Sequence, residues 1–308
     1  MADDDNNAPK PFVFYHYAPS LAAAVLFCIF FSISTLFHTW RMTAQRTWYF
    51  VPFVIGCLFE AVGYIGRALS SNEAPDFTQN PYIIQSVLLL LGPTLMAASV
   101  YMILGRLMIV LHADRHALIR PNWVTKVFVL GDMLSFCTQG GGAGLLTAAK
   151  TQQDVNTGNH IIVGGLVIQI LFFFGFCAVA AVFHVRIRRW PTHRSLALTT
   201  PWRGLLYALY GSSCLLLIRF VYRAAEYAQG ADGTLQGKEF WLYVFDALPM
   251  LTITGVFAVF HPSRVINRAA LEDKPATPVL GLDGHVVLED GSPQPSSTTG
   301  LYVRDTAV

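Results

Sequence analysis

Charged side chains are scarce in this chain. Asp, Glu, Lys and Arg make up 13% of its 308 residues, whereas hydrophobic residues make up 54%. Soluble domains average roughly 25% charged residues. Together with the long apolar runs, this deficit argues against a soluble enzyme and indicates a membrane protein that crosses the bilayer several times.

Several short signatures are also missing. The sequence has no Cys-x-x-Cys pair and no Asn-x-Ser/Thr sequon. It also has no Walker A loop, and this absence argues against ATP-driven pumping by this chain alone. The acidic start of the chain lacks the basic region of a cleaved signal peptide, so the first apolar run is predicted to be a retained helix. All cysteines fall inside apolar runs and are interpreted as packing residues, not disulfides or metal ligands: Cys28, Cys57, Cys137, Cys177 and Cys214.

The histidines and lysines are absent from the places where cofactor chemistry would need them. No histidine is predicted near the middle of the membrane, which argues against a catalytic zinc site. No lysine lies between Lys238 and Lys274, so the last apolar run cannot carry a retinal Schiff base. No Ser/His/Asp arrangement stands out either. We therefore expect a protein that is not an enzyme and uses no metal or cofactor.

Seven apolar runs dominate the sequence. Each has roughly the 20 residues that a helix needs to cross a bilayer. They are Pro19–His38, Trp48–Leu69, Tyr82–Leu111, Val124–Ala149, Ile161–Val185, Trp202–Tyr222 and Phe240–His261. We predict an all-α integral membrane fold, with a seven-helix domain over residues 18–268. Pro93 predicts a kink in the third helix.

Basic residues gather in alternate loops. Arg41 and Arg46 lie in the first loop, and an arginine cluster from Arg186 to Arg194 lies in the fifth. The positive-inside rule then places the N-terminus outside and the C-terminus in the cytoplasm. Residues 1–17 become an extracellular segment. Residues 269–308, rich in Pro, Gly, Ser, Thr and Asp, become a disordered cytoplasmic tail, available to a cytoplasmic partner.

Polar side chains recur at helical spacing on four of the predicted helices. Each set forms a one-sided stripe, and the cost of placing polar groups in lipid predicts that the stripes face inward. The stripes are Glu60, Tyr64 and Arg67; Asp132, Ser135 and Gln139; Arg219, Arg223 and Glu226; and Glu239, Tyr243 and Asp246. Gln85 and Gln169 add amides from two further helices.

The predicted orientation gives these residues a depth. The outer half or rim would hold Arg67, Gln85, Arg219, Arg223, Glu226 and Glu239. The middle would hold Glu60, Gln139, Gln169 and Asp246, with Asp132 nearer the cytoplasm. Such a site fits an amphipathic molecule. A purely structural ion network is the competing interpretation, with Glu60 pairing with Arg67 or Asp246 with Arg219.

The order of these motifs resembles the fungal RTA-like family, named for resistance to aminocholesterol and also called the lipid-translocating exporter family. The matching segments are Glu60-Ala-Val-Gly-Tyr-Ile-Gly-Arg67, Asp132-x-x-Ser-x-x-x-Gln139, Arg219-x-x-x-Arg223-x-x-Glu226, Tyr-Val-Phe-Asp246 and His261-Pro262. The resemblance covers about residues 17–268. It implies a seven-helix fungal protein, located by family analogy in the plasma membrane. It also implies export or flip-type movement of sphingoid bases and other lipids, and resistance to toxic amphiphiles.

We therefore expect a multi-pass protein that binds and exports a sphingoid-base or sterol-like amphiphile. Its partners would be membrane lipids and that small molecule, with no nucleic acid. The candidate binding residues are Glu60, Tyr64, Arg67, Gln85, Asp132, Gln139, Gln169, Arg219, Arg223, Glu226, Glu239 and Asp246. The alternative is a seven-helix receptor or lipid sensor that signals stress to the cytoplasm, although no Asp-Arg-Tyr or Asn-Pro-x-x-Tyr motif is present.

Overall fold

The structure is a computed structural model. It describes residues 19–73, 79–148, 152–198, 200–229, 233, 235, 237–266, 278–280 and 286–288. The predicted extracellular segment, residues 1–17, lies outside the described residues.

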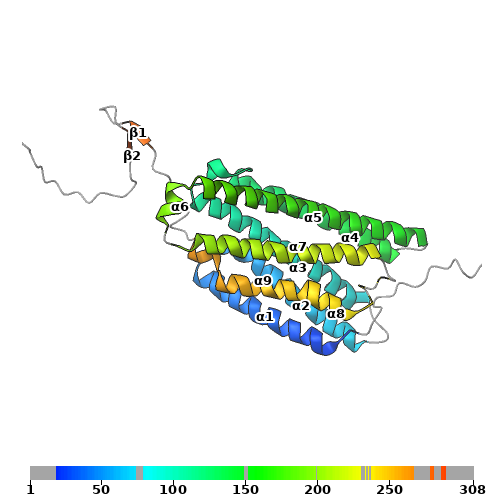
Figure 1. Cartoon of the computed structure of the whole chain (residues 1–308). Helices are drawn as coiled ribbons and strands as arrows, with labels where there is room; N and C mark the ends of the chain where they lie inside the picture. Colours follow the sequence, from blue (N-terminus) through cyan, green and yellow to red (C-terminus); the bar gives the residue numbers. More distant parts are fainter. Residues whose placement is uncertain are drawn as a thin grey trace, which may run out of the picture. The chain divides into compact units, whose positions relative to one another are not determined.

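Long helices lie side by side along one bundle (Figure 1). They are α1 (Leu21–Ala44), α2 (Val51–Asn72), α3 (Gln79–Val110), α4 (Pro121–Ala148), α5 (Gln152–Arg189), α7 (Trp202–Gln229) and a last composite helix. The composite helix joins α8 (Glu239–Leu242), η3 (Tyr243–Ala247) and α9 (Leu248–Val259). Short helices connect them: η1 (Trp48–Phe50), η2 (Asp114–His116), α6 (His193–Ala197) and η4 (Pro262–Arg264).

The helices form a closed ring of neighbours. Helix α1 packs on α2, α2 on α3, α3 on α4, and α4 on α5. The ring continues from α5 to α7 and from α7 to α9, and α9 closes it by packing on α1. Helix α3 also packs on α7 across the ring. Polar side chains on the inner faces of α2, α7 and the composite helix are therefore brought towards one another.

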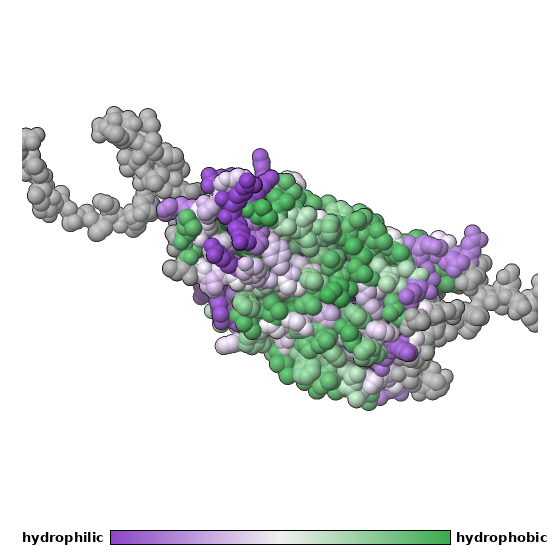
Figure 2. Space-filling model, viewed as in Figure 1, coloured by the Kyte–Doolittle hydropathy of each residue, from purple (hydrophilic) through white to green (hydrophobic). Residues whose placement is uncertain are grey.

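Length and composition support membrane crossing for six helical spans of the described residues. They are Leu21–Ala44, Trp48–Asn72, Ile83–Val110, Gln153–Arg189, Trp202–Gln229 and Glu239–Arg264. Helix α4 is not among these six, so a seventh crossing stays a prediction. Many large apolar side chains lie on the outer surface, among them Leu36 and Leu130, which are both 71% exposed. On the face in Figure 2, apolar residues fill the middle of the bundle and hydrophilic residues gather towards its ends.

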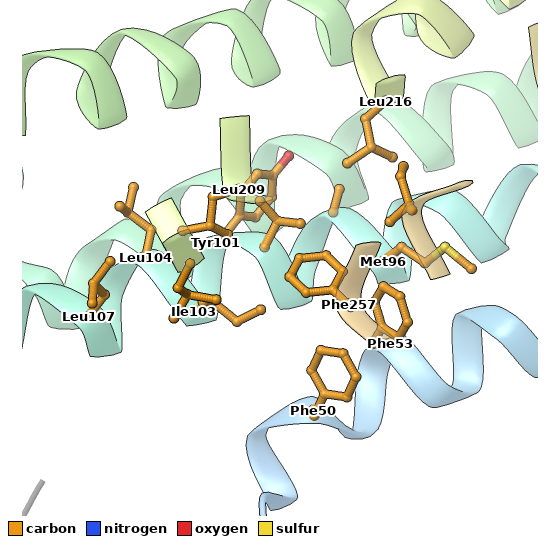
Figure 3. Packing of buried hydrophobic residues seen from close by; sticks show 14 of the residues in the cluster. Phe50, Phe53, Met96, Tyr101, Ile103, Leu104, Leu107, Leu209, Leu216 and Phe257 are labelled. Atoms are coloured by element: carbon orange, nitrogen blue, oxygen red, sulfur yellow. The ribbon is translucent and has the colours of Figure 1, made fainter. Parts of the chain in front are cut away.

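Aromatic and aliphatic side chains fill the interior between α2, α3 and α9. The rings of Phe50 and Phe53 stack with centroids 4.4 Å apart, and Phe257 meets Phe53 edge-on at 5.2 Å. Met96 and Tyr101 of α3 belong to the same buried cluster (Figure 3). This packing holds the three helices that border the polar residues described below.

Glycine permits very close approach between α2 and α3. A Cβ atom added at Gly56 would lie 2.7 Å from the backbone oxygen of Gly92. Small residues at such contacts let helix backbones meet in membrane proteins, where close van der Waals packing drives association. The α2–α3 pair is thereby held in one register.

A separate unit, residues 272–308, is described only at two short strands. Strands β1 (Pro278–Leu280) and β2 (Val286–Leu288) pair antiparallel, with Val279 opposite Val287. The prediction of disorder over residues 269–308 did not anticipate this ladder, which the β-branched valines favour. The other residues of the predicted tail lie outside the described part of the chain.

Candidate functional site

An ion pair joins the end of α2 to α8. Arg67, 0% exposed, donates from Nη2 to Glu239 Oε1 at 2.8 Å and from Nε to the Tyr243 hydroxyl at 3.2 Å. The Tyr243 hydroxyl donates in turn to Glu239 Oε1 at 3.1 Å. Glu239 also accepts from the backbone N–H of Ser20, the N-cap of α1, at 2.9 and 3.0 Å. One carboxylate therefore holds α1, α2 and α8 together.

A larger ion cluster joins α7 to the composite helix. Asp246 Oδ1 lies 2.5 Å from Arg219 Nε, and Asp246 Oδ2 accepts from Arg223 Nη2 at 2.6 Å. Arg223 Nη1 donates to Glu226 Oε2 at 2.9 Å. Arg219 also donates from Nη2 to the backbone oxygen of Leu89 on α3. Arg219 and Asp246 are 1% and 2% exposed, so their charges are paired out of contact with solvent.

A π-helical turn aims Asp246 at this cluster. Residues Tyr243–Ala247 form the turn, and Pro249 follows within the first residues of α9. Proline has no N–H for the carbonyl four residues earlier, and its ring crowds that carbonyl, so a wider turn relieves the contact. The spacing of Glu239, Tyr243 and Asp246 predicted one straight stripe. The wide turn instead sends Glu239 and Tyr243 to Arg67 and sends Asp246 to Arg219 and Arg223.

Glu60 borders the ion cluster from α2. It is 2% exposed, and its Oε1 has no hydrogen-bond partner among the described residues. Its electrostatic neighbours include Arg219, Asp246 and Arg223. A Cβ atom at Gly92 would lie 3.0 Å from Glu60 Oε1, so this carboxylate is packed against α3.

The charges around Asp246 do not balance. Two guanidinium groups, on Arg219 and Arg223, pair with the carboxylates of Asp246 and Glu226, and the Glu60 carboxylate is a further electrostatic neighbour of both arginines. With all of them ionised, one negative charge is in excess. An uncompensated buried carboxylate is costly, and it is stabilised by a proton or by a cation.

An amide network forms a third polar group, on α3, α4 and α5. Gln139 Nε2 donates to Ser135 Oγ at 2.6 Å and to Gln169 Oε1 at 3.2 Å. Gln169 Nε2 donates to Thr94 Oγ1 at 3.3 Å, and Ser135 Oγ donates to the backbone oxygen of Gly165 at 2.7 Å. The network ties the three helices together without a formal charge.

The remaining predicted residues have more local surroundings. Asp132 is 2% exposed and lies beside Tyr101 of α3. Tyr64 is stacked on Phe31, with ring centroids 5.6 Å apart. Gln85 lies against Gly66, where an added Cβ would be 3.3 Å from the Gln85 backbone nitrogen.

The predicted candidates thus form distinct bonded groups, and not one continuous contact set. The Asp246–Arg219 pair is present as the sequence suggested, whereas Arg67 makes its ion pair with Glu239. Sequence reasoning missed the roles of Ser20 and Thr94, which are ordinary polar residues without a distinctive spacing. It also missed the π turn, for which Pro249 was the available signal.

Comparison with known proteins finds a matching family model and several relatives. Residues 53–269 match the family model described as "RTA1 like protein". Protoporphyrin uptake protein 1 of Saccharomyces cerevisiae is 38% identical, over 80% of this chain and 91% of its own. Protein RTA1 of the same yeast is 34% identical, over 90% of this chain and 93% of its own.

A sphingoid long-chain base transporter, RSB1 of Saccharomyces cerevisiae, is 25% identical over 79% of this chain and 72% of its own. No solved structure matches the chain. The family model covers residues 53–269, and the relatives at 38% and 34% identity align with 80% and 90% of the chain, so this multi-pass membrane protein belongs to the RTA1-like family.

Proposed function

We propose that the protein binds a cationic amphiphile, such as a sphingoid base, at the Asp246 cluster and helps to move it to the outer leaflet of the plasma membrane. The observation that carries this proposal is Glu60. Its buried carboxylate borders a cluster of two arginines and two carboxylates, so an ionised Glu60 gives the site one negative charge in excess. An ammonium head group would supply the missing positive charge.

The names of the relatives suggest amphipathic cargo but differ in its chemistry. One relative is named for protoporphyrin uptake, and another for transport of sphingoid long-chain bases. The excess of carboxylate around Asp246 favours an amine over an anionic ligand, because an additional anion would be repelled. The sphingoid base is therefore the cargo that fits this cluster better.

The proposal includes α4 as the seventh crossing, with the N-terminus outside. Helix α4 has 28 residues, which at 1.5 Å per residue spans about 42 Å, more than the hydrocarbon core of a bilayer. It packs between α3 and α5 in the ring. Its polar residues Asp132, Ser135 and Gln139 are buried, which keeps them away from lipid.

The test is movement of a fluorescent sphingoid base across liposomes that contain only the purified protein. Glu60→Gln preserves side-chain shape and removes the excess negative charge. We expect it to slow movement at least about tenfold, since loss of a buried ionic contact weakens binding by that order. Asp114→Asn, on the exposed η2 loop, is the matched control and should transport normally.

A second measurement separates transport from folding. Glu60→Gln should melt in detergent at or above the temperature of the unmodified protein, because it relieves an unpaired buried charge. Unchanged transport by correctly folded Glu60→Gln protein would refute the proposal. Absence of lipid movement with the unmodified protein, combined with ligand-dependent binding of a cytoplasmic partner, would support a receptor instead.

A further inference from the structure

A basic hollow lies at the end of the bundle where α5 finishes. It has a volume of about 610 Å³ and is lined by Arg115, His116, Arg186 and Trp190. Arg115 and His116 belong to η2, whereas Arg186 lies in the last turn of α5. Arg186 Nη1 donates to the backbone oxygen of His116 at 3.4 Å, which joins the two walls. Figure 2 shows hydrophilic residues gathered over this end of the bundle.

The lining of the hollow offers donors and positive charge. No acidic side chain lines it, and neither arginine makes an ion pair within the described residues. The His116 ring is 6% exposed, and its Nε2 has no hydrogen-bond partner among the described atoms. Burial and the neighbouring Arg115 lower the pKa of His116, and a bound anion would offset both effects. Guanidinium groups beside an imidazole whose Nε2 is free to bind are suited to a phosphate group.

An apolar groove of about 340 Å³ lies along the same helix. Its lining residues are Ile119, Val127, Phe128, Leu171, Phe172, Gly175 and Val179. Gly175, Val179 and Arg186 follow one another at spacings of four and seven residues, which places them on one face of α5, and Trp190 comes directly after the helix. About 16 Å of helix separates Gly175 from Arg186. The groove and the hollow thus succeed each other along one side of α5.

We propose that this face of α5 binds an anionic phospholipid. Its phosphate occupies the hollow of Arg115, His116 and Arg186, and an acyl chain lies in the groove beside Phe128 and Gly175. A lipid is favoured over a soluble phosphate because an apolar groove lies on the same face of α5 as the basic hollow, about three turns of helix away. None of these residues belongs to the Asp246 cluster, so the site is separate from the proposed transport site and does not depend on it.

The test is binding of a diacyl phosphatidylinositol phosphate to purified full-length protein, measured by native mass spectrometry and by fluorescence titration. Parallel titrations use the water-soluble inositol phosphate and a phosphatidylcholine with the same chains. Arg115→Gln/Arg186→Gln removes both guanidinium groups from the hollow. Arg188→Gln/Arg189→Gln is the charge-matched control, because both residues are exposed and do not line the hollow.

A third variant fills the groove. A Cβ atom at Gly175 would meet only Phe128 Cε1, at 3.6 Å, so Gly175→Leu is accommodated at its base and extends into the groove. We expect the Arg115/Arg186 variant to weaken phospholipid binding at least about tenfold and the control to change it less than twofold. Gly175→Leu should weaken binding of the diacyl lipid only.

Two results would overturn the inference. One is equal phospholipid affinity for the Arg115/Arg186 variant and the Arg188/Arg189 control, since binding would then follow net charge alone. The other is equal affinity for the soluble inositol phosphate and the diacyl lipid, since the groove would then contribute nothing. Thermal melting of each variant in detergent identifies any loss that arises from unfolding.

Discussion

Asp246 Oδ1 lies 2.5 Å from Arg219 Nε and joins the π turn of the composite helix to α7. Both side chains are almost fully buried. The pair therefore links two helices, and it also lies at the site proposed above for the head group of an amphiphile. Measurements of stability and of transport on the same variants distinguish the structural role of the pair from the proposed binding role.

Removing Asp246 should destabilise the bundle. Asp246→Ala leaves Arg219 and Arg223 without this carboxylate, and loss of one partner from a buried ion pair costs about 3–5 kcal/mol. Asp246→Leu combined with Arg219→Met replaces the pair with apolar groups and should cost less. Denaturant unfolding in detergent measures both free energies. A single variant as stable as the unmodified protein would contradict the prediction.

The Arg67–Glu239 pair should show coupling in a double-mutant cycle. Arg67→Met and Glu239→Gln each remove one side of a charged hydrogen bond, so their combined cost should be smaller than the sum by about 1–3 kcal/mol. Lys238→Gln, at an exposed neighbouring position, is the control, and its free energy of unfolding should lie within about 0.5 kcal/mol of that of the unmodified protein. Strictly additive effects would show that the pair contributes no interaction energy.

Gly56→Ala should loosen the α2–α3 contact. The added methyl would lie 2.7 Å from the Gly92 backbone oxygen, which cannot move as a flexible side chain can. Overpacking of this kind costs about 1–3 kcal/mol. Gly211→Ala is the control, because nothing lies within 4 Å of its added Cβ. The melting temperature should therefore fall for Gly56→Ala and should be unchanged or higher for Gly211→Ala.

Deleting Val244 should abolish transport while keeping the last helix. Removal of one residue from the π turn restores regular helix and rotates Glu239 and Tyr243 by about 100° relative to α9. The Arg67 and Asp246 contacts cannot then form together. Helix content by circular dichroism should be retained, and liposome transport should fall to background. Val244→Ala keeps the residue count and should transport normally; equal activity of the two variants would rule out a role for the π turn.

Much of the fold follows from local patterns. The apolar runs predicted the long helices because a helix satisfies its own backbone hydrogen bonds in lipid, whatever its neighbours. The stripe through Arg219, Arg223 and Glu226 predicted an inward polar face, and Arg219 and Glu226 are indeed buried. The run assigned to the fourth helix forms α4, but its polar and glycine content leaves it outside the spans that composition alone supports.

The pairing of those stripes could not be predicted from spacing. The contact of Arg67 with Glu239 depends on helix rotation, and rotation depends on the π turn before Pro249. Likewise, Ser20 reaches Glu239 only because α1 closes the ring beside the composite helix. Contacts between residues far apart in sequence arise from packing, which no periodicity encodes.

The sequence alone determined the membrane class, the approximate helix ranges and the polar residues that had to face inward, because these depend on the transfer of single side chains between water and lipid. The tertiary structure decided which carboxylate meets which guanidinium group. It also separated the amide network from the ion cluster and left Glu60 beside Asp246 without a bonded partner for its Oε1. Those outcomes depend on the closed packing of the helices, where a wide turn or one missing Cβ changes which groups can touch.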